Sequence, residues 1–156
     1  MKIIIWNSRR NILDAAIKFF THGKGTHAAF LRADGETIHE AFYPRVRDRL
    51  MTSKDLVGME VFELKGIKKF EHKEFEHLFD FNLKRNIRYS ITDLFRYALN
   101  MPCRDEHHTF CSKYVMNCLR AILPDSRLPL VRLPVKDWAS PRDLRISPLL
   151  IKSEIE

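Results

Sequence analysis

The chain has 156 residues, 45% apolar and 30% charged, which fits one globular domain spanning 1–156 and excludes a disordered chain. Its 27 Lys and Arg outnumber the 20 Asp and Glu, giving a formal net charge of +7. The basic residues are scattered and do not interleave with aromatics, so nucleic acid is not the expected partner, whereas another acidic partner, such as an anionic lipid, stays open.

The N-terminus begins with a short apolar run, residues 3–6, that predicts a buried strand. The run is too short for a signal peptide, and no later segment reaches the length of a membrane span. We therefore expect a cytoplasmic protein without a membrane span. Residues 11–20 follow with apolar side chains at helical spacing, and Gly23 and Gly25 are expected to end this helix.

A hairpin is predicted next, with strands over 26–32 and 36–43 on either side of Asp34-Gly35. Pro44 is expected to close the second strand. Four further segments follow: a connection over 45–50, a strand over 58–64, a helix over 69–85, and a short helix over 93–99 capped by Ser90 or Thr92.

The last predicted helix covers residues 111–123, because apolar side chains recur on one of its faces and Pro124 stops it. The tail from 124 to 156 contains several prolines and is expected to be mostly irregular. The order of elements indicates an α+β fold, with helices packed against a mostly antiparallel sheet.

Among the three cysteines, Cys111 has the placement of a nucleophile. It lies in the first turn of the predicted helix, where free backbone N–H groups and the helix dipole favour a negatively charged side chain. Cys118 lies deeper on the same face and is expected in the core, and Cys103 has no comparable placement. An odd number of cysteines does not suggest a disulfide framework, so we expect reduced thiols.

A thiolate nucleophile needs a partner base, and His27 lies on a predicted strand between small residues. If Asp34-Gly35 is a two-residue turn, Ala29 faces Glu40, and Glu40 lies diagonal to His27, about 7 Å away between α-carbons on the same face. A carboxylate there could accept the imidazole N–H and fix its tautomer. His39 points to the opposite face and is the weaker candidate.

Three segments resemble the motifs of the permuted NlpC/P60-type papain-like thiol enzymes, the YiiX/YaeF-like group and, more distantly, lecithin:retinol acyltransferase. The segments are Thr26-His27-Ala28-Ala29-Phe30, Ile38-His39-Glu40-Ala41 and Phe110-Cys111-Ser112-Lys113-Tyr114-Val115. The resemblance extends to Tyr89 and to residues 140–144, Ser-Pro-Arg-Asp-Leu. It implies a circularly permuted papain-like fold and a cysteine hydrolase.

The mechanism that the resemblance implies is thiol acyl transfer through Cys111, His27 and Glu40. The backbone N–H of Cys111 and the Tyr89 hydroxyl would stabilise the oxyanion. The substrate would be a peptide, an amide or an acyl lipid, and no cofactor or metal is required. Many relatives have Gly or Val after the histidine, where this chain has Ala28.

Three other interpretations stay open. Cys103, His107, His108 and Cys111 form a Cys-x3-His-His-x2-Cys cluster that could bind zinc. The domain could be a non-catalytic basic binding module. With the same chemistry, it could instead be a lipid acyl hydrolase or acyltransferase, if Phe19, Phe20 and Phe42 line an acyl groove.

Overall fold

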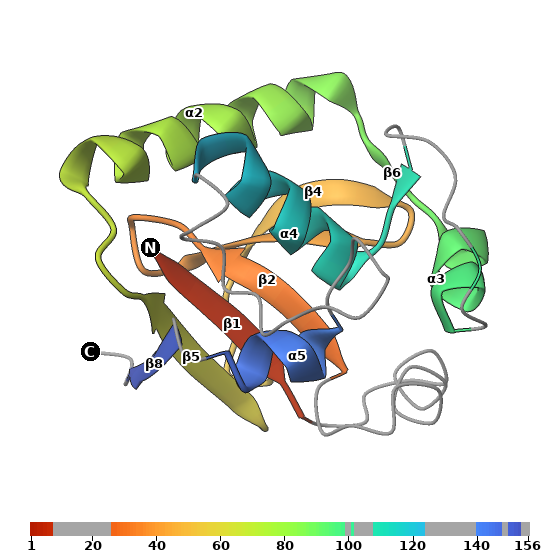
Figure 1. Ribbon diagram of the computed structural model, residues 1–156, viewed down its shortest axis with the longest axis horizontal. Coiled ribbons are helices and arrows are strands. Elements are labelled where there is room, and N and C mark those ends of the chain that lie inside the picture. The colour runs from red at the N-terminus through yellow and green to blue at the C-terminus, as the bar shows by residue number, and fades with distance from the viewer. Residues whose placement is uncertain (8–25, 99–100, 102–107, 124–139, 148–149, 154–156) are drawn as a thin grey trace.

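The computed structural model describes residues 1–7, 26–98, 101, 108–123, 140–147 and 150–153 (Figure 1). The predicted helix over 11–20 lies outside these residues, as do Cys103 and His107. The described residues form an α+β fold in which helices pack against a curled sheet of eight strands. This confirms the predicted fold class at that level.

The sheet is mostly antiparallel, as the sequence predicts. Its strand order is β7-β6-β4-β3-β2-β1-β5-β8, and β6–β7 is the one parallel pair in the described sheet. The strands are β1 Lys2–Trp6, β2 His27–Leu31, β3 Thr37–Phe42, β4 Arg45–Leu50, β5 Met59–Leu64, β6 Arg88–Tyr89, β7 His108–Thr109 and β8 Leu150–Ser153.

The four described helices are α2 Lys69–Arg85, α3 Ile91–Ala98, α4 Cys111–Ile122 and α5 Pro141–Arg145. Three of them, α2, α3 and α4, were predicted, and α5 was not. At the start of α2, the Glu71 carboxylate accepts the backbone N–H of Lys68 at 2.7 Å. Ser90 caps α3, because its hydroxyl oxygen accepts the backbone N–H of Asp93 at 2.9 Å.

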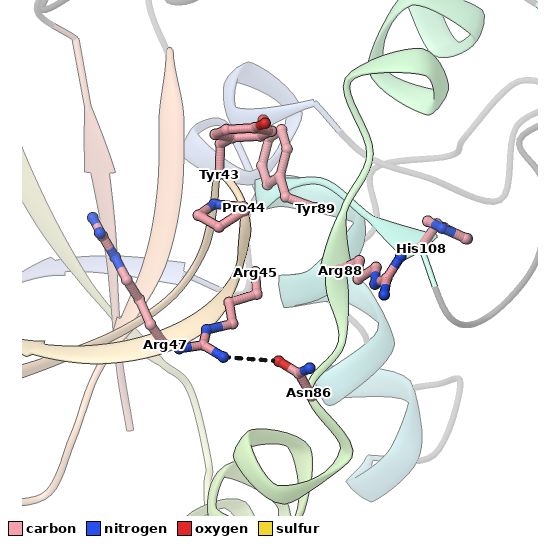
Figure 2. Close-up of a pocket in the computed structure, with 8 residues that line it drawn as sticks. All are labelled: Tyr43, Pro44, Arg45, Arg47, Asn86, Arg88, Tyr89 and His108. Atoms are coloured by element: carbon pink, nitrogen blue, oxygen red, sulfur yellow. Dashed lines mark hydrogen bonds between the residues drawn. The ribbon is translucent and has the colours of Figure 1, made fainter.

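The prediction of a connection over 45–50 was wrong, because these residues form strand β4. Its backbone pairs with β3 over its whole length, from Phe42↔Arg45 to Thr37↔Leu50. The charged side chains of β4 have partners on both faces. Arg47 and Arg49 pair with the buried Glu40 on one face. On the other face, Asp48 pairs with Arg32 and His39. Beyond β4, the Tyr89 N–H donates to the Pro44 carbonyl at 2.9 Å, which joins β6 to the β3–β4 turn (Figure 2).

The prediction of a mostly irregular tail was also wrong in its described part. Pro141 opens α5, a position that its missing N–H suits. Strand β8 then pairs with β5 at the edge of the sheet. Glu60 on β5 connects both segments to the sheet, since its carboxylate accepts hydrogen bonds from Arg145 of α5 at 2.5 Å and from Lys152 of β8 at 3.0 Å.

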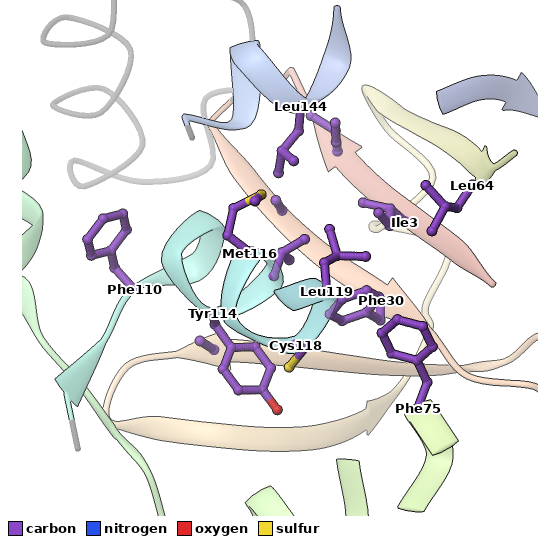
Figure 3. Close-up of a cluster of buried hydrophobic side chains, with 14 of the residues drawn as sticks. Ile3, Phe30, Leu64, Phe75, Phe110, Tyr114, Met116, Cys118, Leu119 and Leu144 are labelled. Atoms are coloured by element: carbon purple, nitrogen blue, oxygen red, sulfur yellow. The ribbon is translucent and has the colours of Figure 1, made fainter. Parts of the chain in front are cut away.

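The main core lies between the sheet and the layer of α2 and α4 (Figure 3). Phe30 on β2 contacts two rings of α2, with ring centroids 6.0 Å from Phe75 and 4.9 Å from Phe79. From α4, Tyr114, Val115, Cys118 and Leu119 fill the same layer. Cys118 is therefore a core residue, as predicted.

A second, smaller cluster occupies the opposite face of the central strands. It contains Ile4, Trp6, Ala29, Leu31 and Ile38, with Met51 and Met59 packed against it. Strands β1, β2 and β3 are thus buried on both faces, which explains the nearly continuous apolar runs of β1 and β2.

Truncation on α2 tests the position of the main core. We expect Phe79→Ala to lower the free energy of unfolding by about 3–5 kcal/mol, because Phe79 is fully buried. The matched control is Phe81→Ala on the same helix, where the side chain is 54% exposed, and it should cost less than about 1 kcal/mol. Urea unfolding measures both, and equal losses would contradict this core.

Candidate functional site

The β2–β3 hairpin brings His27 and Glu40 together. The sheet register, Phe30↔His39 and Leu31↔Ile38, extends along the strands to put Ala29 opposite Glu40, as the sequence predicted. In the structure, Nε2 of His27 lies 2.9 Å from Oε2 of Glu40. A carboxylate only accepts hydrogen bonds, so Nε2 carries the hydrogen.

The turn itself differs from the prediction. It is a four-residue loop, 33–36, closed by the bond from Arg32 N–H to the Thr37 carbonyl at 2.9 Å. A two-residue type I′ turn needs positive φ at both Asp34 and Gly35, but only Gly35 adopts it (75°). The Asp34 carboxylate instead accepts the N–H groups of residues 36 and 37 at 2.9 and 2.8 Å. The loop is longer by one residue on each side, so the register is unchanged.

Glu40 is held from two directions. Its side chain is 1% exposed, and Oε1 accepts from Arg47 at 2.9 Å and from Arg49 at 2.8 Å, both on β4. Burial opposes the carboxylate form, but the imidazole of His27 and the guanidinium of Arg49 outweigh it and lower the pKa of Glu40 to about 2. Glu40 is therefore ionised at neutral pH, which suits the role of orienting an imidazole.

Cys111 lies at the first residue of α4, as the sequence predicted. Its side chain is 1% exposed and lies close enough to His27 to raise the pKa of that imidazole. Phe110 precedes it in an extended conformation without a side-chain cap on the helix. The start of α4 thus reaches the beginning of β2, and the imidazole of His27 joins Cys111 to Glu40.

The pKa of His27 is set by these two partners. Burial lowers it, but the interactions with Cys111 and Glu40 together outweigh burial and raise it to about 10. Two rings also confine the imidazole, since Trp6 and Phe42 lie 5.3 and 5.8 Å away between centroids. His27 is therefore a protonated, positioned group at neutral pH.

Sequence reasoning missed the residues that support Glu40. Arg49 also donates to Asp55 at 2.7 and 2.8 Å, and Asp55 is 2% exposed. The backbone carbonyl of Asp55 accepts the indole N–H of Trp6 at 2.7 Å. The sequence did contain a pattern that could have predicted them. Arg47 and Arg49 are two residues apart, which places them on the same face of a strand if 45–50 is read as one.

Tyr89, the remaining predicted site residue, lies on β6. It pairs with Thr109 of β7, two residues before Cys111, and its side chain is 8% exposed. It lines a pocket beside the site together with residues of β4 and β7 (Figure 2). Tyr89 is thus placed next to the segment that leads into Cys111.

His39 forms a separate network on the helix side of the sheet. Its Nδ1 lies 2.5 Å from Asp48, and its Nε2 lies 2.6 Å from the Tyr114 hydroxyl. The hydroxyl oxygen accepts from Asn82 at 2.9 Å, and Asn82 also reaches the sulfur of Cys118 at 3.7 Å. Burial raises the pKa of the Cys118 thiol to about 12. This confirms that His39 and Glu40 point to opposite faces.

The predicted zinc cluster falls partly outside the described residues, since Cys103 and His107 are not among them. Of its other members, His108 lies on β7 and Cys111 faces His27. Within the part of the chain that is described, no helix is long and apolar enough to cross a membrane.

Comparison with known proteins gives a similarity in fold. No family model matches the chain, and no curated protein does. The fold is similar to that of the metalloprotein yiiX from Escherichia coli O157:H7, with a TM-score of 0.73, 15% sequence identity, and coverage of 99% of this chain and 96% of yiiX. This agrees with the YiiX-like fold that the three sequence motifs suggested. At this identity it establishes the fold alone.

The His27–Glu40 pair should stabilise the fold most between pH 4.5 and 6.5. The pKa of His27 rises from 6.5 to about 10 on folding, so its contribution is full below pH 6.5 and declines as pH rises toward 10. The pKa of Glu40 falls from 4.5 to about 2, so its contribution is full above pH 4.5 and declines as pH falls toward 2.

Urea unfolding of wild type and His27→Gln across this range measures the effect. The difference in the free energy of unfolding should be largest in the window and shrink on both sides. A difference independent of pH would contradict the pairing.

Tyr114→Phe tests the second network. The variant leaves His39 and Asn82 without their shared hydroxyl in a buried position, so we expect a loss of about 1–3 kcal/mol in the free energy of unfolding. Tyr43→Phe is the control, because that side chain is 58% exposed and should change stability by less than about 0.5 kcal/mol. Equal effects in the two variants would argue against the network.

Proposed function

We propose that this chain is a cysteine hydrolase of the permuted NlpC/P60-type papain-like class. The observation that carries the proposal is that the imidazole of His27 lies 2.9 Å from the buried Glu40 carboxylate and close enough to Cys111 for that side chain to raise its pKa. Nucleophile, base and orienting acid come from three elements, α4, β2 and β3, in the order of contact that thiol acyl transfer requires.

In the proposed reaction, the Sγ proton of Cys111 already resides on His27 as an imidazolium, and the thiolate sulfur attacks a substrate carbonyl. Glu40 holds Nε2, which leaves Nδ1 to carry this proton. The proton then passes to the leaving nitrogen or oxygen as its bond to the carbonyl carbon breaks, leaving a thioester on Cys111. Water attacks the thioester, gives a proton to His27, and the thiol is restored.

Charge stabilisation would come from the groups around the start of α4. The backbone N–H of Cys111 is one of the free donors at the helix N-terminus, and the Tyr89 hydroxyl is the proposed second donor to the oxyanion. The raised pKa of His27 suits the departure of the leaving group, because a protonated imidazole can donate its proton to that group.

The fold relative yiiX is described as a metalloprotein. In the described residues of this chain, no group of three or more His, Cys, Asp or Glu side chains could hold a metal ion. Glu40 already accepts from Arg47, Arg49 and His27, and two guanidiniums on its second oxygen would repel a cation. The described residues therefore do not fit a metal, and the proposed reaction has no step through one.

Alkylation with iodoacetamide near neutral pH tests the nucleophile. We expect fast, selective modification of Cys111, and slowing of roughly a hundredfold in His27→Ala, because the base is lost. Glu40→Gln should slow the reaction less, since the glutamine can still accept the imidazole N–H. Cys118 is the internal control, because its pKa of about 12 and its burial keep it inert.

Mass spectrometry of the alkylated peptides gives the rate at each cysteine, and circular dichroism confirms that each variant is folded. Equal reactivity of all cysteines, or a Cys111 rate unchanged in His27→Ala, would reject the proposal. Hydrolysis of peptide amides and of acyl esters, each compared with Cys111→Ala, then separates an amidase or peptidase from a lipid acyl hydrolase.

A further inference from the structure

A pocket of about 620 Å³ opens beside the candidate catalytic site (Figure 2). Its size falls within the usual range for small-molecule sites. It lies between the Tyr43–Pro44 turn, the start of β4, strand β6 and strand β7. The lining residues are Tyr43, Pro44, Arg45, Arg47, Asn86, Arg88, Tyr89 and His108.

Three basic residues that line the pocket lie next to one another on three adjacent strands. Arg45 on β4 pairs directly with Arg88 on β6, and Arg88 pairs with His108 on β7. Like charges directly opposite one another in a sheet are destabilising. Among the described residues that line the pocket, none is acidic, so none of them forms a salt bridge with Arg45 or Arg88. An anion between these side chains would remove the repulsion.

The geometry also orients one arginine for binding. Arg45 donates to the side-chain carbonyl of Asn86 at 3.2 Å (Figure 2). Asn86 ends α2 in a left-handed conformation (φ 52°), which sets it at the pocket rim. The guanidinium of Arg47, by contrast, points away from the pocket toward Glu40. The guanidiniums that line the pocket and do not pair with Glu40 are therefore those of Arg45 and Arg88, with His108 on the neighbouring strand.

Residues that line the pocket also contact the candidate catalytic residues or lie next to them in the sheet. Arg47 lines the pocket and pairs with Glu40 at 2.9 Å. The same guanidinium lies 4.4 Å from the ring centre of Phe42, whose ring packs edge-on against His27. On the other side, Tyr89 pairs with Thr109, just before the start of α4. A molecule bound in the pocket would thus lie beside Arg47, which holds Glu40, and beside the segment that leads into Cys111.

We propose that this pocket binds an anionic group, a phosphate or a carboxylate, on the substrate of Cys111. Guanidiniums bind both groups through charge-assisted, often paired hydrogen bonds. The proposal deepens the proposed function, on which it rests, by giving the substrate of Cys111 a negatively charged group.

Binding can be measured without catalysis in the Cys111→Ala background. NMR titration with inorganic phosphate and with succinate should shift the signals of Arg45, Arg88 and His108, and Arg45→Gln/Arg88→Gln should weaken binding of at least one anion tenfold or more. The arm that responds identifies phosphate or carboxylate as the preferred group. The control, Lys69→Gln/Lys73→Gln, removes the same charge from exposed positions at the far end of α2 and should bind as before.

Turnover provides the second measurement, with p-nitrophenyl butyrate and its carboxylate-bearing analogue, the p-nitrophenyl hemiester of glutaric acid. We expect Arg45→Gln/Arg88→Gln to lower kcat/KM for the anionic ester at least tenfold more than for the neutral one. Equal losses for the two esters, or anion binding that the double variant leaves unchanged, would overturn the anion pocket. Loss of selective Cys111 labelling with retained anion binding would instead overturn the proposed hydrolase alone.

Discussion

A carboxylate buried at the centre of the sheet requires charged partners on several neighbouring elements. Glu40 is 1% exposed, and a buried charge is tolerated only with partners on its oxygens. One oxygen takes the imidazole of His27, and the other takes Arg47 and Arg49. The second arginine then needs Asp55. The need for these partners explains why a segment as charged as β4 lies against the core.

Two consecutive residues of strand β3 belong to two separate polar networks, one on each face of the sheet. His39 points toward α2 and α4, where it links Asp48 to Tyr114, and Glu40 points to the other face, where it holds His27. Because side chains alternate along a strand, the sheet keeps these networks apart. The first network joins the helices to the sheet, whereas the second leaves an imidazole at the helix start, beside a basic pocket.

Much of this arrangement could be predicted from the sequence, where the pattern was local. The bounds of α2, the position of Cys111 and the faces of His39 and Glu40 follow from helical spacing and strand alternation. Strand β4 was missed because its stability comes from distant partners, which local propensity does not include. Strands β6 and β7 have two residues each and are defined only by their neighbours, so the row Arg45, Arg88 and His108 had no signal in the sequence.

The two described cysteines of α4 have a consequence for oxidative damage. Cys111 and Cys118 are seven residues apart on one helix, which separates their α-carbons by about 10 Å. A disulfide requires α-carbons within about 7 Å, so the helix forbids a bond between them. If Cys111 is oxidised to a sulfenic acid, Cys118 cannot resolve it, and recovery depends on a thiol from outside this helix. The helix that positions Cys111 therefore also prevents Cys118 from reducing an oxidised Cys111 through a disulfide.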